Sequence, residues 1–208
     1  MTIASSPDDL RRRQVLGVFQ MPSVQTMVSR KSSITNAFVN AVIPTIPPTS
    51  AEVEEALHVL GMTCDDIRCA YCGDPKTEWD HLRPLVLDRR PTGYVSEIAN
   101  LVPACGKCNQ SKGNKPWREW MLSKARLSPS GRGIADLNER IARLSAYERW
   151  RKPLSVDFIA ILGQEAWDHY WTLCEAAIEE LRQSQQVADH MRAKIIAALE
   201  QGSAKTWR

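Results

Sequence analysis

The sequence lacks long apolar runs, internal repeats and low-complexity tracts. A membrane-spanning helix needs roughly 20 consecutive apolar residues, and no stretch approaches that length, so we expect no membrane span. The first ten residues contain no apolar signal core, so we expect no secretory signal and a cytoplasmic location. The absence of repeats excludes a solenoid. The 208 residues, 43% of them hydrophobic, suffice for a core in one or two small domains.

Four of the six cysteines form two Cys-x-x-Cys pairs, Cys69–Cys72 and Cys105–Cys108. Each pair can place two thiolates on one metal, and two pairs complete a tetrahedral zinc site whose closed shell indicates a structural role. Disulfides are the alternative in a secreted protein, but the ligand spacing and the missing export signal favour zinc in a reducing compartment. We expect the remaining Cys64 and Cys174 to be buried free thiols.

Positive charge is concentrated directly after the second cysteine pair. Residues 106–132 carry seven basic side chains against one acidic side chain, a net charge of +6, although the whole chain carries only +3. Such a concentration favours contact with a phosphate backbone, whereas a solvated helix face is the alternative. We therefore predict DNA, most simply double-stranded, as the partner. The candidate contacts are Lys107, Lys112, Lys115 and Arg118.

Helical patterns flank the cysteine-rich segment on both sides. Residues 1–65 are predicted to be a helical arm or packing region, and residues 129–208 a second helical region. Caps, prolines and apolar spacing set the helix boundaries. The predicted helices run from Ser6-Pro7 to Leu16, from Ser33 to Pro44, from the Thr49/Glu52 capping box to Gly61, from Ile134 to Leu144 and over 164–200.

Residues 66–128 show strand and turn signals instead. A strand is predicted at Thr77–His81, followed by a turn-rich loop and a returning strand at Leu101–Ala104. The second cysteine pair leads into a helix that breaks near Gly113 and restarts with Asn114 as its N-cap. The predicted fold class is α+β and mainly helical, with a zinc-clamped strand–loop–strand–helix core between the two flanks.

Three side chains near the cysteine pairs suit phosphodiester hydrolysis, which needs a base and a cation that stabilises the developing charge. His81 suits the base because the ordinary pKa of imidazole lies near neutrality. Asp80 and the amide oxygen of Asn109 are hard ligands suited to Mg²⁺ or Mn²⁺. Neighbouring strand residues point to opposite faces, so Asp80 and His81 need not compete for one position. Asn100 is expected to hold the loop and orient the imidazole.

Together these residues resemble the four-cysteine zinc branch of the HNH, or ββα-metal, endonucleases. The motif consists of Cys69-x-x-Cys72, Asp80-His81, Pro84, Asn100-Leu101, Cys105-x-x-Cys108-Asn109 and Lys112, within about residues 66–118. The resemblance implies a ββα fold with one catalytic divalent metal, and hydrolysis to 5′-phosphate and 3′-hydroxyl products.

The same resemblance implies roles for individual residues. His81 is the implied general base, Asp80 and Asn109 are the implied ligands of the catalytic metal, and Asn100 is the implied structural asparagine. The family's motif often ends in histidine where this chain has Asn109, an accepted variant. That difference leaves the choice between Mg²⁺ and Mn²⁺ open.

Several functions are compatible with the sequence. Our interpretation is a stand-alone endonuclease of restriction or defence type, from a prokaryote or phage, because no helicase or polymerase motif is present. A homing or phage-type HNH nickase and an RNA-directed nuclease are alternatives. A non-catalytic zinc module that binds DNA or protein is another, but it has no use for Asp80, His81 and Asn109 together.

Two further patterns concern assembly and packing. One HNH site cuts one strand, so a double-strand break at a palindrome favours a two-fold homodimer. We expect the apolar stripe over 164–199 and the arm in 1–65 to build the dimer interface. A monomeric nickase is the alternative. A second Trp-Asp-His at 167–169 is expected to serve packing. Trp117 and Trp120 could stack on bases, but tryptophans three apart on a helix are expected to cover a core.

Overall fold

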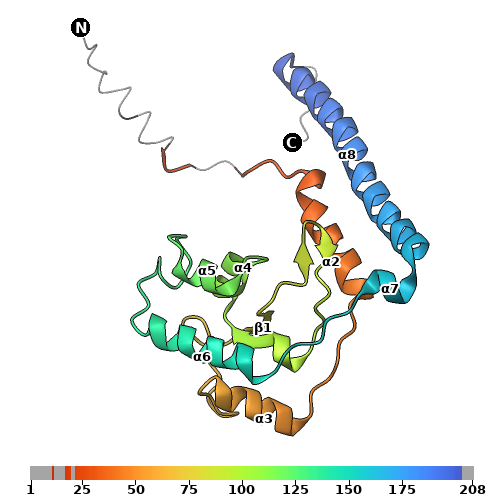
Figure 1. Ribbon diagram of the computed structural model, residues 1–208. Helices are drawn as coiled ribbons and strands as arrows, with labels where there is room; N and C mark the ends of the chain where they lie inside the picture. Colours follow the sequence, from red (N-terminus) through yellow and green to blue (C-terminus); the bar gives the residue numbers. More distant parts are fainter. Residues whose placement is uncertain (1–10, 12–16, 20–21, 203–208) are drawn as a thin grey trace. The chain divides into compact units, whose positions relative to one another are not determined.

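The structure, a computed structural model, describes residues 11, 17–19 and 22–202 (Figure 1). The helix predicted from Ser6 to Leu16 therefore lies outside the described residues, apart from Arg11. Two compact units are distinguished: Lys31–Glu179, and the described residues before and after it. No helix in the described ranges is long and apolar enough to cross a membrane.

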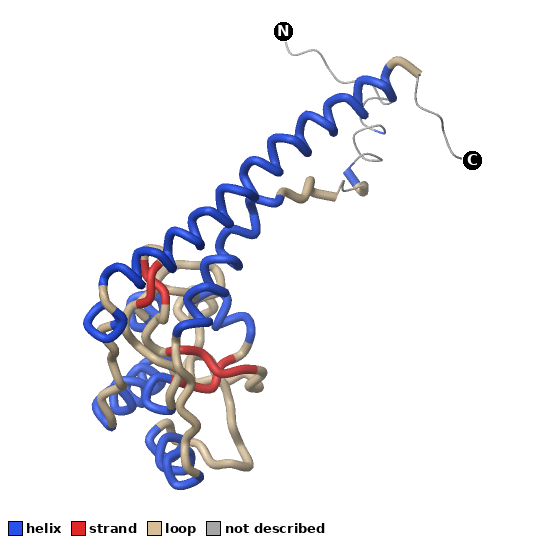
Figure 2. Tube along the Cα trace, turned by 90° about the vertical axis from the view of Figure 1, so that its right-hand side faces the viewer, coloured by secondary structure: helices blue, strands red, loops and turns tan. Residues whose placement is uncertain are grey.

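Helices dominate both units, and the strands are short (Figure 2). The α-helices are α2 (Lys31–Val42), α3 (Ser50–Val59), α4 (Gly106–Lys112), α5 (Trp117–Leu122), α6 (Leu137–Trp150), α7 (Phe158–Leu162) and α8 (Gln164–Glu200), with 3-10 helices η1 (Met27–Arg30) and η2 (Ile98–Asn100). The strands are β1 (Glu78–His81), β2 (Val86–Leu87), β3 (Arg90–Pro91) and β4 (Leu101–Ala104). The mainly helical α+β class predicted from the sequence is confirmed.

The capping signals before the cysteine-rich segment act as predicted. Thr49 accepts from the Glu52 backbone N–H at 3.3 Å, and the Glu52 carboxylate accepts from the Thr49 backbone N–H at 2.8 Å, which is a reciprocal capping box. The chain leaves this helix through Gly61 at φ 70°, a conformation that glycine adopts without Cβ strain. Upstream, α2 stops at Val42, two residues before Pro44.

Strands β1 and β4 form the antiparallel pair of the ββα core. Asp80 pairs with Val102 and His81 pairs with Leu101. After β4 the chain passes directly into α4, whose first turn contains Cys108 and Asn109. The order of strand, long loop, strand and helix is therefore the one predicted. It places the end of β1 beside the start of the helix that carries the last motif residues.

One hydrophobic cluster joins this core to helices of both predicted flanks. It contains the four paired cysteines, Val102, Trp117 and Trp120, together with residues of α3 and α6. The Tyr147 hydroxyl of α6 donates to the backbone oxygens of Ile98 and Leu101, which fixes α6 against the loop before β4. Trp117 and Trp120 are buried, so the prediction that they cover a core is confirmed. The domain boundaries at residues 65 and 128 stay predictions.

A second cluster packs α2 against the β2–β3 hairpin and the first half of α8. Val39, Val86, Val95, Trp171 and Ile178 are among its buried members. The Tyr170 hydroxyl donates to the backbone oxygen of Phe38 at 2.9 Å, and the Trp167 ring stacks on Phe158 with centroids 5.4 Å apart. The second Trp-Asp-His therefore contributes its tryptophan to packing, as predicted.

The other unit contains η1 and the distal half of α8. Its described contacts include a hydrogen bond from the Met27 backbone N–H to Gln185 Oε1, at 2.6 Å. Large apolar side chains along this half of α8 are exposed. They are Val187, Met191, Ile195, Ile196 and Leu199.

The structure also corrects two predictions. Asn114 does not cap α5, which starts at Trp117 with Pro116 as its N-cap. The backbone N–H of Lys115 instead donates to the Lys112 oxygen at 3.1 Å, so the chain is still in a turn at Asn114. Cys64 is exposed, whereas Cys174 is buried as expected, because Cys64 lies in the turn after α3 and not on a packed face. Helix α7 and the β2–β3 hairpin were not predicted from the sequence.

Candidate functional site

The two cysteine pairs converge on one point. The sulfurs of Cys69, Cys72, Cys105 and Cys108 all lie within 4.8 Å of one another, and all four residues are buried. The Cys72 and Cys105 sulfurs are 3.7 Å apart. Tetrahedral Zn–S bonds of about 2.3 Å place the sulfurs roughly 3.8 Å apart, so these residues fit a four-thiolate zinc ion that would tie the loop before β1 to the start of α4.

The contacts among the cysteines favour the thiolate form at Cys69 and the protonated thiol at Cys108. Hydrogen bonds with Cys108 and Cys72 lower the pKa of the Cys69 thiol to about 4, whereas hydrogen bonds with Cys69 and Cys72 raise the pKa of the Cys108 thiol. An Arg132 guanidinium nitrogen lies 3.6 Å from the Cys108 sulfur and a second lies 2.7 Å from Asp74. Four crowded sulfurs beside one cation favour a bound metal ion that removes their remaining protons.

The candidate catalytic side chains share one polar pocket. Asp80, His81 and Asn109 all line a cavity of about 170 Å³, which α2 closes on another side through Asn36 and Asn40. Asp80 and His81 come from β1, and Asn109 comes from α4. A carboxylate and an amide that line one pocket offer the oxygen donors that a hard divalent cation prefers, so the residues present fit a Mg²⁺ or Mn²⁺ ion.

Asp80 is held by a buried network. Its Oδ2 accepts a hydrogen bond from the Tyr71 hydroxyl at 2.6 Å and lies 3.1 Å from Lys112 Nζ. Burial raises the pKa of Asp80, and the attraction of Lys112 opposes that shift. Burial likewise lowers the pKa of Lys112 against the attraction of Asp80. A carboxylate offers about four lone-pair positions, so the network orients Asp80 while leaving capacity to bind a cation.

His81 is positioned by Ser96, which was not predicted from the sequence. Its Nε2 lies 2.9 Å from the Ser96 hydroxyl. If Nε2 carries the proton in this contact, Nδ1 is the acceptor, which is the form that a general base needs. Burial, helped by the positive charge of Lys112, lowers the pKa of His81 to about 4. The imidazole is therefore neutral at physiological pH.

Asn100 fixes the backbone immediately after His81. It is fully buried, and its Oδ1 accepts from the Arg83 N–H at 2.9 Å while its Nδ2 donates to the Arg83 oxygen at 3.1 Å. Its own backbone oxygen accepts from the Leu82 N–H at 2.8 Å. These contacts lock the chain as it leaves β1, and they place Asn100 behind the pocket and not in it.

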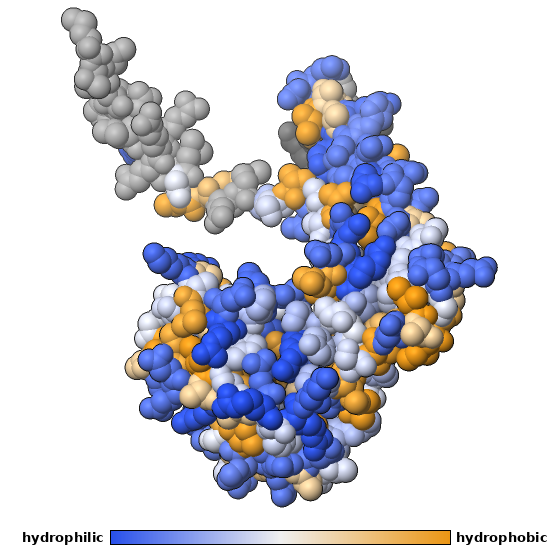
Figure 3. Space-filling model, in the orientation of Figure 1, coloured by the Kyte–Doolittle hydropathy of each residue, from blue (hydrophilic) through white to orange (hydrophobic). Residues whose placement is uncertain are grey.

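The four candidate nucleic-acid contacts divide into two kinds. Lys107, Lys115 and Arg118 are exposed. Figure 3 shows that hydrophilic residues mix with small hydrophobic patches on one face of the molecule. Lys112 differs from the prediction, because its side chain has 0% exposure and its Nζ contacts Asp80 and the His81 oxygen, the latter at 2.7 Å. Its charge balances a buried carboxylate and does not reach the surface.

Further residues of the site gave no signal that could have identified them in the sequence. Tyr71 lies inside the first cysteine pair, where aromatic residues have no required role. Ser96 and Asn36 lie in a loop and a helix far along the chain from His81. Only the folded chain brings these residues to the pocket, because the loop before β4 passes beside β1 and α2 packs against the core.

Comparison with known proteins agrees with this geometry. The family model described as HNH endonuclease matches residues 69–115. The chain is 39% identical over 77 residues to the CRISPR-associated endonuclease Cas9 of Corynebacterium diphtheriae. That similarity covers 35% of this chain and only 6% of the relative. No solved structure gives a significant match.

The matched segment starts at the first zinc-site cysteine and ends just beyond α4. It therefore contains both strands of the ββα core, all four cysteines and the three side chains of the polar pocket. The described fold, the cysteine cluster and the family match coincide on the same residues. The chain thus carries an HNH endonuclease domain of the four-cysteine type at residues 69–115.

Proposed function

We propose that this protein is a metal-dependent DNA endonuclease in which His81 is the general base. The observation that carries the proposal is the shared polar pocket, where a neutral imidazole faces the same space as a carboxylate and an amide. His81 would take a proton from the attacking water on Nδ1, while Ser96 holds Nε2 at 2.9 Å. The resemblance implies 5′-phosphate and 3′-hydroxyl products.

Asp80 and Asn109 would hold the catalytic Mg²⁺ or Mn²⁺. When bound, such an ion supplies positive charge that stabilises the phosphorane and the leaving oxygen. The chain's own contribution is to hold the two ligands, Asp80 through Tyr71 and Lys112 and Asn109 through the first turn of α4. Zinc at the four cysteines would have a structural role, because four thiolates leave no open coordination position.

The decisive test is the His81→Ala variant. We expect it to retain zinc and DNA affinity but to lose Mg²⁺- or Mn²⁺-dependent plasmid cleavage by at least about 100-fold, the usual contribution of a general base. Zinc content by metal analysis and DNA binding by fluorescence anisotropy are the controls. Cleavage at the wild-type rate would show that another group is the base. A wild-type protein that binds DNA without cutting it would favour the non-catalytic zinc module.

The biological role proposed is restriction or defence inside a prokaryotic or phage-infected cell. A family match to endonucleases and a bacterial relative named as an endonuclease support the nuclease activity on which this role depends. Sequencing the ends of digested genomic DNA distinguishes the roles. A short palindrome supports restriction, a long asymmetric site supports homing, and scattered ends support a non-specific nuclease. The substrate class is tested by comparing cleavage of duplex DNA, single strands and structured RNA at one salt concentration.

We further propose that the protein is a homodimer through the distal half of α8. Val187, Met191, Ile195 and Leu199 recur every four residues on this helix, and each is at least 57% exposed. Four-residue spacing places them along one face. Light scattering should give twice the chain mass, and Met191→Glu with Ile195→Glu should halve it. A monomer that yields only nicked plasmid would contradict the dimer.

A further inference from the structure

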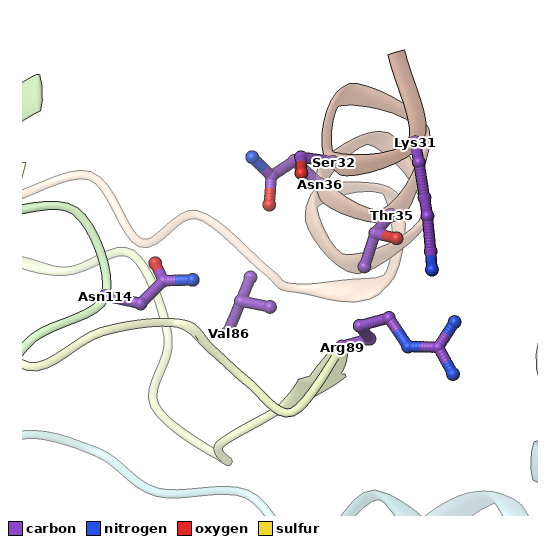
Figure 4. A pocket seen from close by; sticks show the side chains of 7 residues that line it. All are labelled: Lys31, Ser32, Thr35, Asn36, Val86, Arg89 and Asn114. Carbon is purple, nitrogen blue, oxygen red and sulfur yellow. The ribbon is translucent and has the colours of Figure 1, made fainter. Parts of the chain in front are cut away.

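A second cavity adjoins the candidate catalytic pocket. It has a volume of about 330 Å³ and lies between α2, the β2–β3 hairpin and the turn between α4 and α5 (Figure 4). Asn36, Val86 and Asn114 line both cavities. The two spaces are therefore neighbouring parts of one cleft. We call the second cavity the α2 cleft; its α2 wall lies outside the residues that match the HNH family.

The α2 cleft has the charge of a phosphate-binding surface. Lys31 and Arg89 line it from opposite elements, and no acidic side chain is among its described lining residues. Figure 4 shows the ends of both cationic side chains on the same side of the cleft. The remaining polar groups are hydroxyls and amides, which are common partners of phosphate and sugar oxygens.

A buried hydroxyl in the cleft has no partner in the protein. Thr35 is only 4% exposed, yet its Oγ1 makes no hydrogen bond within the described structure. Buried polar atoms are nearly always hydrogen-bonded, and an exception calls for an explanation. Thr35 lines the cleft together with Lys31 and Arg89. A ligand oxygen that reaches the hydroxyl would give it the partner that the protein does not supply.

The turn that presents Arg89 has two non-glycine residues at positive φ. Asp88 and Arg89 have φ values of 48° and 63°, the left-handed geometry of a two-residue hairpin turn, which usually carries asparagine and glycine. Packing of α2 against β3 supports the hairpin, and Arg89 thereby faces α2 across the cleft.

We propose that the α2 cleft binds the phosphate backbone of the substrate strand next to the phosphate that is cut. Lys31 and Arg89 contact the flanking phosphate, and Thr35 donates its hydroxyl to an oxygen of the same strand. This inference rests on the proposed function of the adjoining pocket. It assigns to the helix before the HNH domain a substrate-positioning role that the domain's own motif does not supply.

Binding to a DNA duplex tests the proposal. Zinc-loaded His81→Ala protein, without added Mg²⁺ or Mn²⁺, is titrated onto a labelled duplex over a range of salt concentrations. Adding Lys31→Ala and Arg89→Ala should weaken binding at least about tenfold and reduce the slope of log K against log salt by about one per cation. The charge-matched control is Arg143→Ala with Arg149→Ala on α6, which should change neither quantity.

Thr35→Val separates ligand binding from folding. Valine keeps the shape and removes a hydroxyl that has no partner in the protein, so the melting temperature should be unchanged or higher, while DNA affinity falls severalfold. Unchanged affinity in both Thr35→Val and the double alanine variant would overturn the proposal. If Thr35→Val lowers the melting temperature and leaves the DNA affinity unchanged, Thr35 serves folding, and the proposed contact between its hydroxyl and the DNA is wrong.

The outcomes also separate this proposal from the proposed function. Cleavage by the wild-type protein with unaltered binding of the cleft variants would reject the cleft and leave the nuclease intact. Loss of binding in the cleft variants, combined with a wild-type protein that never cuts DNA, would support the cleft and reject the catalytic assignment.

Discussion

Replacing Lys112 by methionine distinguishes a surface contact with DNA from a buried structural charge. The Lys112 side chain has 0% exposure, and its Nζ lies 3.1 Å from Asp80 and donates to the His81 oxygen at 2.7 Å and the Gly113 oxygen at 3.2 Å. Removing one partner of a buried ion pair leaves an uncompensated charge and costs about 3–5 kcal/mol. We therefore expect a destabilisation of that size.

Thermal and denaturant unfolding of zinc-loaded protein measure this cost. For a chain of this size, about 1 kcal/mol lowers the melting temperature by roughly 2–4 °C, so the variant should melt roughly 6–20 °C lower. The exposed Lys115→Met is the matched control and should change stability by less than about 0.5 kcal/mol. Adding Asp80→Asn to Lys112→Met should recover part of the loss, because it removes the unpaired charge.

A DNA-binding measurement completes the comparison. If Lys112 balances Asp80, the salt slope of binding by the folded variant should equal that of the wild type. A stable Lys112→Met protein whose salt slope is smaller by about one would mean that Lys112 contacts a phosphate, and the buried ion pair would then be the wrong description of the working enzyme.

Three further predictions follow from the same contacts. Removing zinc with a chelator should unfold the ββα core, because the four thiolates tie its ends together. Circular dichroism and a lost melting transition would show the unfolding, whereas an unchanged fold without zinc would contradict a structural metal. Asn100→Ala should cost about 2–4 kcal/mol in unfolding free energy, because it removes both side-chain hydrogen bonds with Arg83; a melting temperature equal to that of the wild type would refute this. The pKa of His81 lies near 4, so the base stays neutral as the pH falls from 8 to 6, and single-turnover rates should decline only toward pH 4; an acid inflection at 6.5 or above would argue against the assignment.

The motif residues were predictable from the sequence because each has a strict local requirement. Paired cysteines need a fixed spacing to share a metal ion, and the predicted cluster forms with all sulfurs within 4.8 Å. The strand ending at His81, the returning strand from Leu101 and the helix containing Asn109 follow from equally local signals. The capping box at Thr49 is another case, since two side chains three residues apart determine it.

The residues that complete the pocket were not predictable, because tertiary packing places them. Ser96 reaches His81 only after the loop folds back, and α2 reaches the pocket only because Val39 and Ile43 pack with Val86 in the second cluster. Lys112 was predicted as a DNA contact from charge density alone. Charge density does not show which lysine turns inward to meet a buried carboxylate.

The most direct test of the central claim is cleavage of supercoiled plasmid by purified, zinc-loaded wild-type protein. We predict nicked or linear products with Mg²⁺ or Mn²⁺, with ends that a ligase rejoins without prior phosphorylation, as 5′-phosphate and 3′-hydroxyl ends require. The His81→Ala protein, prepared in the same way, should give no products above background. Intact plasmid at high wild-type concentration with either metal, or equal cleavage by both proteins, would contradict the account.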